Sequence, residues 1–122
     1  MNRIILFLFI VLIASCKEPI AQNTIVSVEE FKTLVLDKDV PLVDVRTQDE
    51  FNDGHIGHAV NIDYFEEDTF TQKFARFDKD KPIYIYCKSG GRSQKAAKIL
   101  HELGFNEIID LKGGYDAWID KN

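Results

Sequence analysis

The sequence predicts an α/β fold in which a small central parallel β-sheet is flanked by helices. From Thr24 onward, short runs rich in β-branched residues alternate with stretches of helical periodicity. This alternation is typical of a parallel sheet with crossover helices. The chain has 122 residues, of which 45% are hydrophobic and 11% aromatic, which is enough for one domain with a core. No internal repeat divides it, so we expect a single domain over residues 25–122.

The predicted strands are short and mostly apolar. They cover residues 41–45, 59–62, 82–86 and 107–111. The run PIYIY at 82–86 is the clearest of them, because its proline stands at the first position, where the missing N–H does least harm.

Capping residues and apolar spacing mark the predicted helices. Ser27 and Glu30 form a capping box ahead of an apolar stripe, and Thr47 and Glu50 form a second box for a short helix. Further helical patterns cover residues 66–77 and the stretch after residue 93, which Gly104 ends. A final turn or helix is expected at 113–118.

The first residues have the composition of an export signal. Arg3 precedes the unbroken apolar run IILFLFIVLIA, which is too short to span a bilayer as a helix. The ending IASC resembles the lipobox of bacterial lipoproteins, whose cysteine is lipidated and becomes the N-terminus. We therefore expect a signal peptide at 1–15, lipidation at Cys16 and a tether at 16–24. An ordinary signal peptide cut near Ala14, or an uncleaved anchor, is the alternative, but it gives Cys16 no role.

This interpretation places the domain outside the cytoplasm, held on a bacterial membrane by its lipid and located in the periplasm. Loss of Arg3 with the signal leaves 14 basic and 20 acidic residues, a net charge of −6. An acidic surface argues against nucleic acid as a partner. Lipidation of Cys16 would leave Cys87 without a disulfide partner, although exported proteins commonly form disulfides.

The stretch CKSGGRS, residues 87–93, follows the clearest predicted strand directly. Cys87 thus stands at the carboxyl end of a parallel strand, where open α/β sheets bind ligands. The glycines let backbone N–H groups turn toward one point, and the next helix adds partial positive charge. Lys88 and Arg92 add full positive charges, which favour a thiolate and make Cys87 a candidate nucleophile.

The same loop is predicted to bind the substrate. Its candidate binding residues are Lys88, Ser89, Gly90, Gly91, Arg92 and Ser93. For Cys87 the alternative is a small buried hydrophobic residue. Ser89 and Ser93 can also be interpreted as helix caps.

Loop length separates two chemistries. The tyrosine-phosphatase signature has one residue more between its cysteine and its arginine than this chain has between Cys87 and Arg92. The tighter ring suits a single sulfur atom better than a phosphoryl group. No acidic residue within the loop is placed to protonate a leaving alcohol. The sequence therefore favours sulfur transfer over a phosphatase or arsenate reductase.

Three motifs in order resemble the rhodanese family over nearly the whole domain. They are PLVDVRTQDEFNDGHIGHAVNI, CKSGGRS and LKGGYDAW. The chain departs from the family at His58, where a glycine usually stands. The resemblance implies a single-domain, rhodanese-like sulfurtransferase in which Cys87 carries a persulfide between two half-reactions. It implies a small anionic sulfane-sulfur donor such as thiosulfate, and a thiol or cyanide acceptor.

The remaining polar residues have mainly structural interpretations. Asp44 and Arg46 are candidates for a relay near the substrate, but bracing of the neighbouring loops is the simpler interpretation. His55 and His58 lack further ligands for a recognisable metal set. We expect no metal and no cofactor, and a domain of this size can be a monomer. A second functional hypothesis is a persulfide carrier or sulfide-sensing module that binds a partner and turns over poorly.

Overall fold

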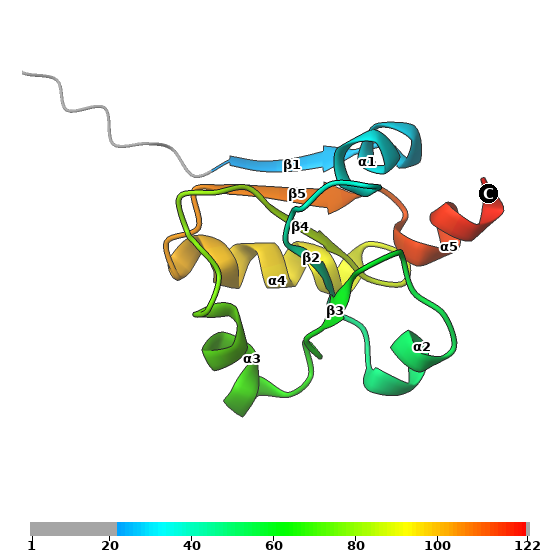
Figure 1. Cartoon of the computed structure of the whole chain (residues 1–122). Coiled ribbons are helices and arrows are strands. Elements are labelled where there is room, and N and C mark those ends of the chain that lie inside the picture. The colour runs from blue at the N-terminus through cyan, green and yellow to red at the C-terminus, as the bar shows by residue number, and fades with distance from the viewer. Residues whose placement is uncertain (1–21, 122) are drawn as a thin grey trace, which may run out of the picture.

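The computed structural model describes residues 22–121. Within this part of the chain, five strands form one parallel sheet in the order β1-β5-β4-β2-β3 (Figure 1). The strands are β1 (Gln22–Val26), β2 (Leu42–Asp44), β3 (Val60–Asn61), β4 (Ile83–Tyr86) and β5 (Glu107–Leu111). The helices are α1 (Val28–Val35), α2 (Gln48–Asn52), α3 (Glu67–Phe74), α4 (Gly91–Glu102) and α5 (Gly114–Asp120). The predicted fold class is confirmed.

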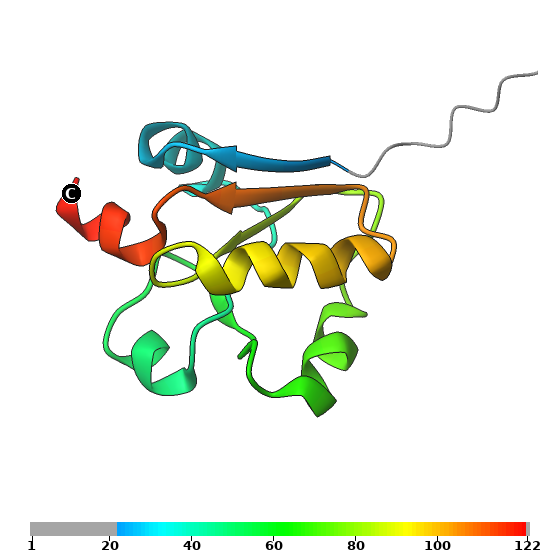
Figure 2. The same ribbon diagram turned by 180° about the vertical axis from the view of Figure 1, so that it is seen from behind.

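The sheet has one hydrophobic cluster on each of its two faces. Alternate residues of β4 point to opposite sides: Ile83 and Ile85 join the cluster that α3 and α4 cover, whereas Tyr84 and Tyr86 join the cluster under α1 and α5. Figure 2 shows α4 lying along the sheet on the face opposite to α1. Such alternation is what a strand buried on both faces requires. Cys87, at the end of β4, belongs to the α3 and α4 side.

Helix starts follow the predicted caps. Thr47 and Glu50 form the complete capping box, because each side chain accepts a hydrogen bond from the other's backbone N–H at 3.3 Å. The Ser27 hydroxyl accepts from the N–H of Glu30 at 3.2 Å, at the start of α1. The helix expected at 66–77 ends at Phe74, and Phe77 packs against the same cluster from the turn beyond it.

The predicted end of the tether was wrong by three residues. Residues 22–24 are the first three residues of β1. This strand pairs with β5 from Gln22 opposite Glu107 to Val26 opposite Leu111. These positions are polar because β1 is an edge strand, and the side chains of Asn23 and Thr24 are exposed. An edge strand needs no apolar run, so the sequence carried no strand signal there.

The predicted signal peptide, the lipidation site Cys16 and the tether up to residue 21 lie outside the described residues. Among residues 22–121, no helix combines the length and the apolar character needed to cross a membrane.

Candidate active site

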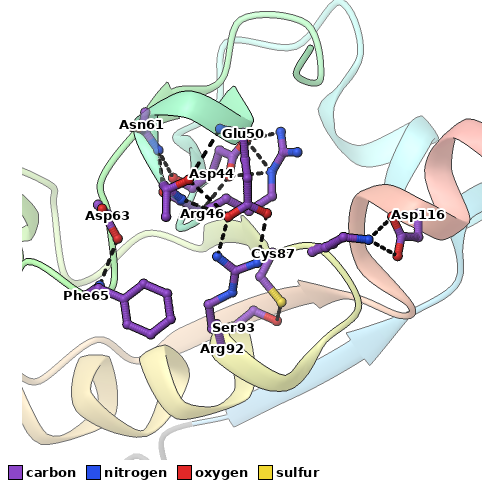
Figure 3. Close-up of polar contacts among 12 residues, drawn as sticks. Asp44, Arg46, Glu50, Asn61, Asp63, Phe65, Cys87, Arg92, Ser93 and Asp116 are labelled. Carbon is purple, nitrogen blue, oxygen red and sulfur yellow. Dashed lines mark hydrogen bonds and ion pairs between the residues drawn. The ribbon is translucent and has the colours of Figure 1, made fainter. Parts of the chain in front are cut away.

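Cys87 begins the loop between β4 and α4, and its side chain is buried, with 1% of the residue exposed. Its Sγ accepts a hydrogen bond from the backbone N–H of Gly90 at 3.0 Å. It also lies 3.4 Å from Oγ of Ser93 (Figure 3). Gly90 has a φ of 115°, in the left-handed region that glycine adopts without strain. This conformation turns the N–H inward, so the loop is built to support negative charge on the sulfur.

Helix α4 starts at Gly91, immediately after the amide that faces the sulfur. The free N–H groups and the macrodipole of a helix place partial positive charge at its first turn. Ser93, in that first turn, is fully buried, and its hydroxyl donates to the carbonyl of Gly90 at 3.1 Å. The loop and the helix start thus form one hydrogen-bonded unit around Sγ.

Arg92 is held at the site by Glu50 from α2. The two guanidinium N–H₂ groups donate to the two carboxylate oxygens at 2.7 and 2.9 Å (Figure 3). The hydrogen bond from Arg92 lowers the pKa of Glu50 to about 2, although burial opposes the shift. The pKa of Arg92 is raised by that hydrogen bond first and, among smaller contributions, by the charge of Cys87. The guanidinium also lies 5.5 Å from the ring centre of the exposed Phe65.

Lys88 pairs with a carboxylate of α5. Its ammonium group donates to both carboxylate oxygens of Asp116, at 3.0 and 2.9 Å (Figure 3). The side chains of the pair are 57% and 45% exposed. Ser89 and Gly91 are exposed at the rim of the loop. Both cations predicted to support the sulfur are therefore already paired with carboxylates.

The segment after β5 packs against the backbone of the loop that begins at Cys87. The N–H groups of Tyr115 and Asp116 donate to the carbonyls of Cys87 and Lys88 at 2.8 and 2.9 Å. Gly114 makes this approach possible: a Cβ there would lie 2.5 Å from the carbonyl oxygen of Cys87, and its φ is +61°. The motif LKGGYDAW was predictive only of the family, although its paired glycines are the sequence signal for this contact.

Asp44 and Arg46 form a buried pair at the end of β2. The guanidinium of Arg46 donates to both carboxylate oxygens of Asp44, the shortest contact being 2.6 Å, and to the carbonyl of Gly54 at 2.7 Å. It also lies 4.2 Å from the ring centre of Tyr115. The pair thus ties the end of β2 to the turn after α2 and to the start of α5, the loops that surround the site.

His55 and His58 make separate contacts with neighbouring residues. His55 stacks on the ring of Phe51 with centroids 3.9 Å apart, and a ring nitrogen of His58 is 3.0 Å from the carbonyl of Val40. Among residues 22–121, no group of three or more potential ligands is arranged to hold a metal ion.

Chemically, the site offers one buried sulfur, one amide donor that faces it, the N–H of Gly90, and a helix N-terminus. These groups stabilise a sulfur anion and can hold the negative charge that moves when a second sulfur is transferred to it.

Known proteins resemble this chain in sequence and structure. The family model described as "Rhodanese-like domain" matches residues 27–121. A thiosulfate sulfurtransferase GlpE from Coxiella burnetii is 36% identical over 85 residues, covering 70% of this chain and 77% of that protein. A protein of the same name from Shewanella oneidensis is 34% identical over 96 residues, covering 79% and 92%. The crystal structure of a rhodanese-like domain protein from Staphylococcus aureus is similar with a TM-score of 0.67 and 33% identity, covering 78% and 90%.

Proposed function

Because the chain belongs to the rhodanese-like domain family, we propose that it is a sulfurtransferase that moves sulfane sulfur from an anionic donor such as thiosulfate to a thiol or cyanide. The transferred atom is carried as a persulfide on Cys87. The main support is the contact of Cys87 Sγ with the Gly90 amide at 3.0 Å, in a loop that opens the N-terminus of α4.

The proposed reaction has two balanced halves. The thiolate of Cys87 attacks the outer sulfur of thiosulfate; the new S–S bond forms as the bond to the sulfonate sulfur breaks, and sulfite leaves with the bonding electron pair. Cyanide or an acceptor thiolate then attacks the outer sulfur of the persulfide, which restores the Cys87 thiolate. The Gly90 amide and the first turn of α4 hold the negative charge throughout.

The test uses the full chain with thiosulfate and cyanide. We expect thiocyanate from the wild type and none from Cys87→Ser, because serine cannot form a persulfide. Ile108→Val, a conservative change in the core cluster that contains Cys87, serves as a control and should still form thiocyanate. Equal thiocyanate from the wild type and Cys87→Ser, or none from either, would refute the thiosulfate and cyanide reaction.

One observation favours the second candidate, a persulfide carrier. Cys87 is buried, and among the described residues it is the one free cysteine, so a persulfide there is shielded and has no neighbouring thiol to discharge it. Intact-mass analysis after exposure to polysulfide measures the gain of one sulfur atom. Stable loading with slow discharge to cyanide and to every thiol offered favours the carrier; rapid discharge favours the enzyme.

We also propose that the protein is exported and lipid-anchored through Cys16, with its domain in the periplasm. The support is the apolar run after Arg3 and the IASC ending. Labelling of cells with a fatty acid and fractionation of their membranes tests this proposal. Label on the wild type that is lost in Cys16→Ser supports the anchor, and membrane-free wild type contradicts it. We propose a monomer as well, which the molecular mass in solution tests.

A further inference from the structure

Both cations of the reactive loop already hold a carboxylate. Arg92 donates through its two terminal nitrogens to Glu50, and Lys88 donates to both carboxylate oxygens of Asp116, at distances of 2.7 to 3.0 Å. An anionic donor that approaches either cation therefore competes with a carboxylate that is bound there. Because Coulomb energy is proportional to charge, this masking disfavours a dianion such as thiosulfate more than a singly charged donor.

An aromatic ring lies against the arginine of the loop. The guanidinium of Arg92 is 5.5 Å from the ring centre of Phe65, and in the view of Figure 3 the Arg92 side chain separates this ring from Cys87. Phe65 is 62% exposed, and its N–H donates to Oδ1 of Asp63 at 2.8 Å. Exposed apolar residues are common in proteins, but this one stands where a substituent of a donor bound at the loop can pack against it.

Phe65 also borders a hollow whose other walls are mostly acidic. The volume of the hollow is about 580 Å³, and three of the residues that line it are exposed acids. Lys73 lies 3.7 Å from one of these carboxylates, that of Glu66, and so offsets part of their charge. The remaining negative charge again acts more strongly on a doubly charged donor. The lining residues are Phe65, Glu66, Glu67, Asp68 and Thr69.

We propose that the site selects organic sulfane-sulfur donors with a single negative charge over inorganic thiosulfate, and that Phe65 and Asp116 determine this selection. The ring of Phe65 contacts the organic substituent of the donor. Asp116 holds Lys88 and thereby masks the charge that would favour the dianion. The inference rests on the proposed function, because it names the donor class for the same transfer to Cys87.

Transfer from an organic thiosulfonate is balanced in the same way as transfer from thiosulfate. The thiolate of Cys87 attacks the outer sulfur, the new S–S bond forms as the bond to the sulfonyl sulfur breaks, and an organic sulfinate leaves with the bonding electron pair. The persulfide on Cys87 is the same product for every donor. Cyanide then removes its outer sulfur as thiocyanate, so one assay reports on all donors.

Three donors separate the effect of charge from that of apolar contact. Thiosulfate is a dianion without an organic group, methanethiosulfonate is a monoanion with a methyl group, and benzenethiosulfonate is a monoanion with an aromatic ring. The full chain is assayed with each donor and saturating cyanide, and the rate with Cys87→Ser is subtracted. Comparison of kcat/KM between variants within one donor cancels the differences in intrinsic reactivity between donors.

The first variant removes the aromatic ring. Phe65→Ala should lower kcat/KM for benzenethiosulfonate by about fivefold, because a contact between two rings is lost. It should leave the values for thiosulfate and methanethiosulfonate within about twofold of the wild type. Ile25→Ala is the matched control, because Ile25 is an apolar residue of the edge strand β1 that is 48% exposed. It should leave all three values unchanged.

The second variant unmasks a cation. Asp116→Asn should raise kcat/KM for thiosulfate by about threefold and for either monoanion by less than about twofold, since the released ammonium group of Lys88 acts on twice the charge in the dianion. Added salt should reduce both effects. Glu29→Gln is the matched control, because its exposed carboxylate pairs with Lys121 at 3.0 Å, and it should change none of the three values.

An equal effect of Phe65→Ala on all three donors, or no effect on any of them, overturns the proposal. An unchanged value for thiosulfate in Asp116→Asn also overturns it. In either case, continued formation of thiocyanate leaves the proposed function standing and refutes the donor selection alone.

A binding measurement decides the selection even without sulfur transfer. If no donor yields thiocyanate, the proposed function fails, but NMR titrations that follow the amide signal of Arg92 still give affinities for benzenesulfonate and sulfate, which carry no transferable sulfur. We expect the wild type to bind benzenesulfonate about fivefold more tightly than sulfate, and Phe65→Ala to lose most of this difference. Equal affinities of the wild type for the two anions refute the selection.

Discussion

The carboxylate of Glu50 holds the guanidinium of Arg92 through two hydrogen bonds of 2.7 and 2.9 Å. The same carboxylate completes the capping box of α2 by accepting from Thr47. One side chain therefore fixes the start of a short helix and the orientation of the arginine beside the reactive sulfur. Helix α2 is positioned as a support for the active-site loop, although it contributes no group that contacts Sγ among those described.

This relationship predicts a loss of stability in acid. A folded-state pKa of about 2 for Glu50, below its usual 4.5, means that the carboxylate stabilises the fold fully above pH 4.5 and loses this effect as the pH falls toward 2. Solvent screening at a side chain that is 27% exposed reduces the contribution to about 2 kcal/mol. Urea unfolding at stepwise pH should show this loss in the wild type and in Glu66→Gln, an exposed control, and a flatter profile in Glu50→Gln. Equal acid sensitivity in all three would contradict the assignment.

The pair of Lys88 and Asp116 predicts a change in donor binding with little change in stability. Both side chains are about half exposed, so Asp116→Asn should alter the free energy of unfolding by less than about 0.5 kcal/mol. The freed ammonium group should attract an anionic donor and lower its KM by about threefold, an effect that weakens with added salt. Lys88→Ala should raise KM, and Lys121→Ala, whose ammonium pairs with Glu29, should leave it unchanged. Steady-state kinetics with thiosulfate measures KM in each variant. An identical KM in all of them would exclude a role for Lys88 in donor binding.

Gly114 is expected to tolerate no side chain. In Gly114→Ala, the new Cβ would lie 2.5 Å from the carbonyl oxygen of Cys87 at a φ of +61°, so the loop and the start of α5 must move apart. We expect a loss of about 2 kcal/mol or more in unfolding free energy and a loss of sulfur transfer. Gly91→Ala provides the matched control for stability, because a Cβ there meets nothing within 4 Å. Comparable thermal midpoints for the two variants would refute the close approach.

Loss of the Arg46 side chain alone should destabilise the fold more than loss of both charges of the Asp44 and Arg46 pair. Arg46→Met leaves the carboxylate of Asp44 buried and without its cation, which costs about 3–5 kcal/mol. The double variant Asp44→Asn with Arg46→Met has no buried charge and should recover part of this loss. Chemical denaturation of both variants and the wild type gives the comparison. If the single variant loses less than about 1 kcal/mol, the pair does not brace the loops as the bonds suggest.

The strands and the reactive loop could be predicted from the sequence because their signals are local. Alternation in PIYIY marks a strand, and here it sends Ile83 and Ile85 to one face and Tyr84 and Tyr86 to the other. The position of Cys87 at the end of that strand follows directly. The edge strand β1, residues 22–26, was not predicted, because one side of an edge strand faces solvent and needs no apolar side chains.

The partners of the loop cations could not be predicted, because they come from distant parts of the chain. Glu50 and Arg92 are 42 residues apart, and Lys88 and Asp116 are 28 apart. Their meeting depends on how α2 and α5 pack around the end of β4, which no local pattern encodes.

The burial of Cys87 also determines how the protein meets oxidants. From Gln22 to Lys121 it is the one free cysteine, so a sulfenic acid formed on it has no second thiol in this region with which to form a disulfide. Such damage is repaired by a thiol from outside the domain, or it advances to the irreversible sulfinic acid. The low exposure of Cys87, 1% of the residue, therefore bears on how long the molecule keeps a working thiol, as well as on its chemistry.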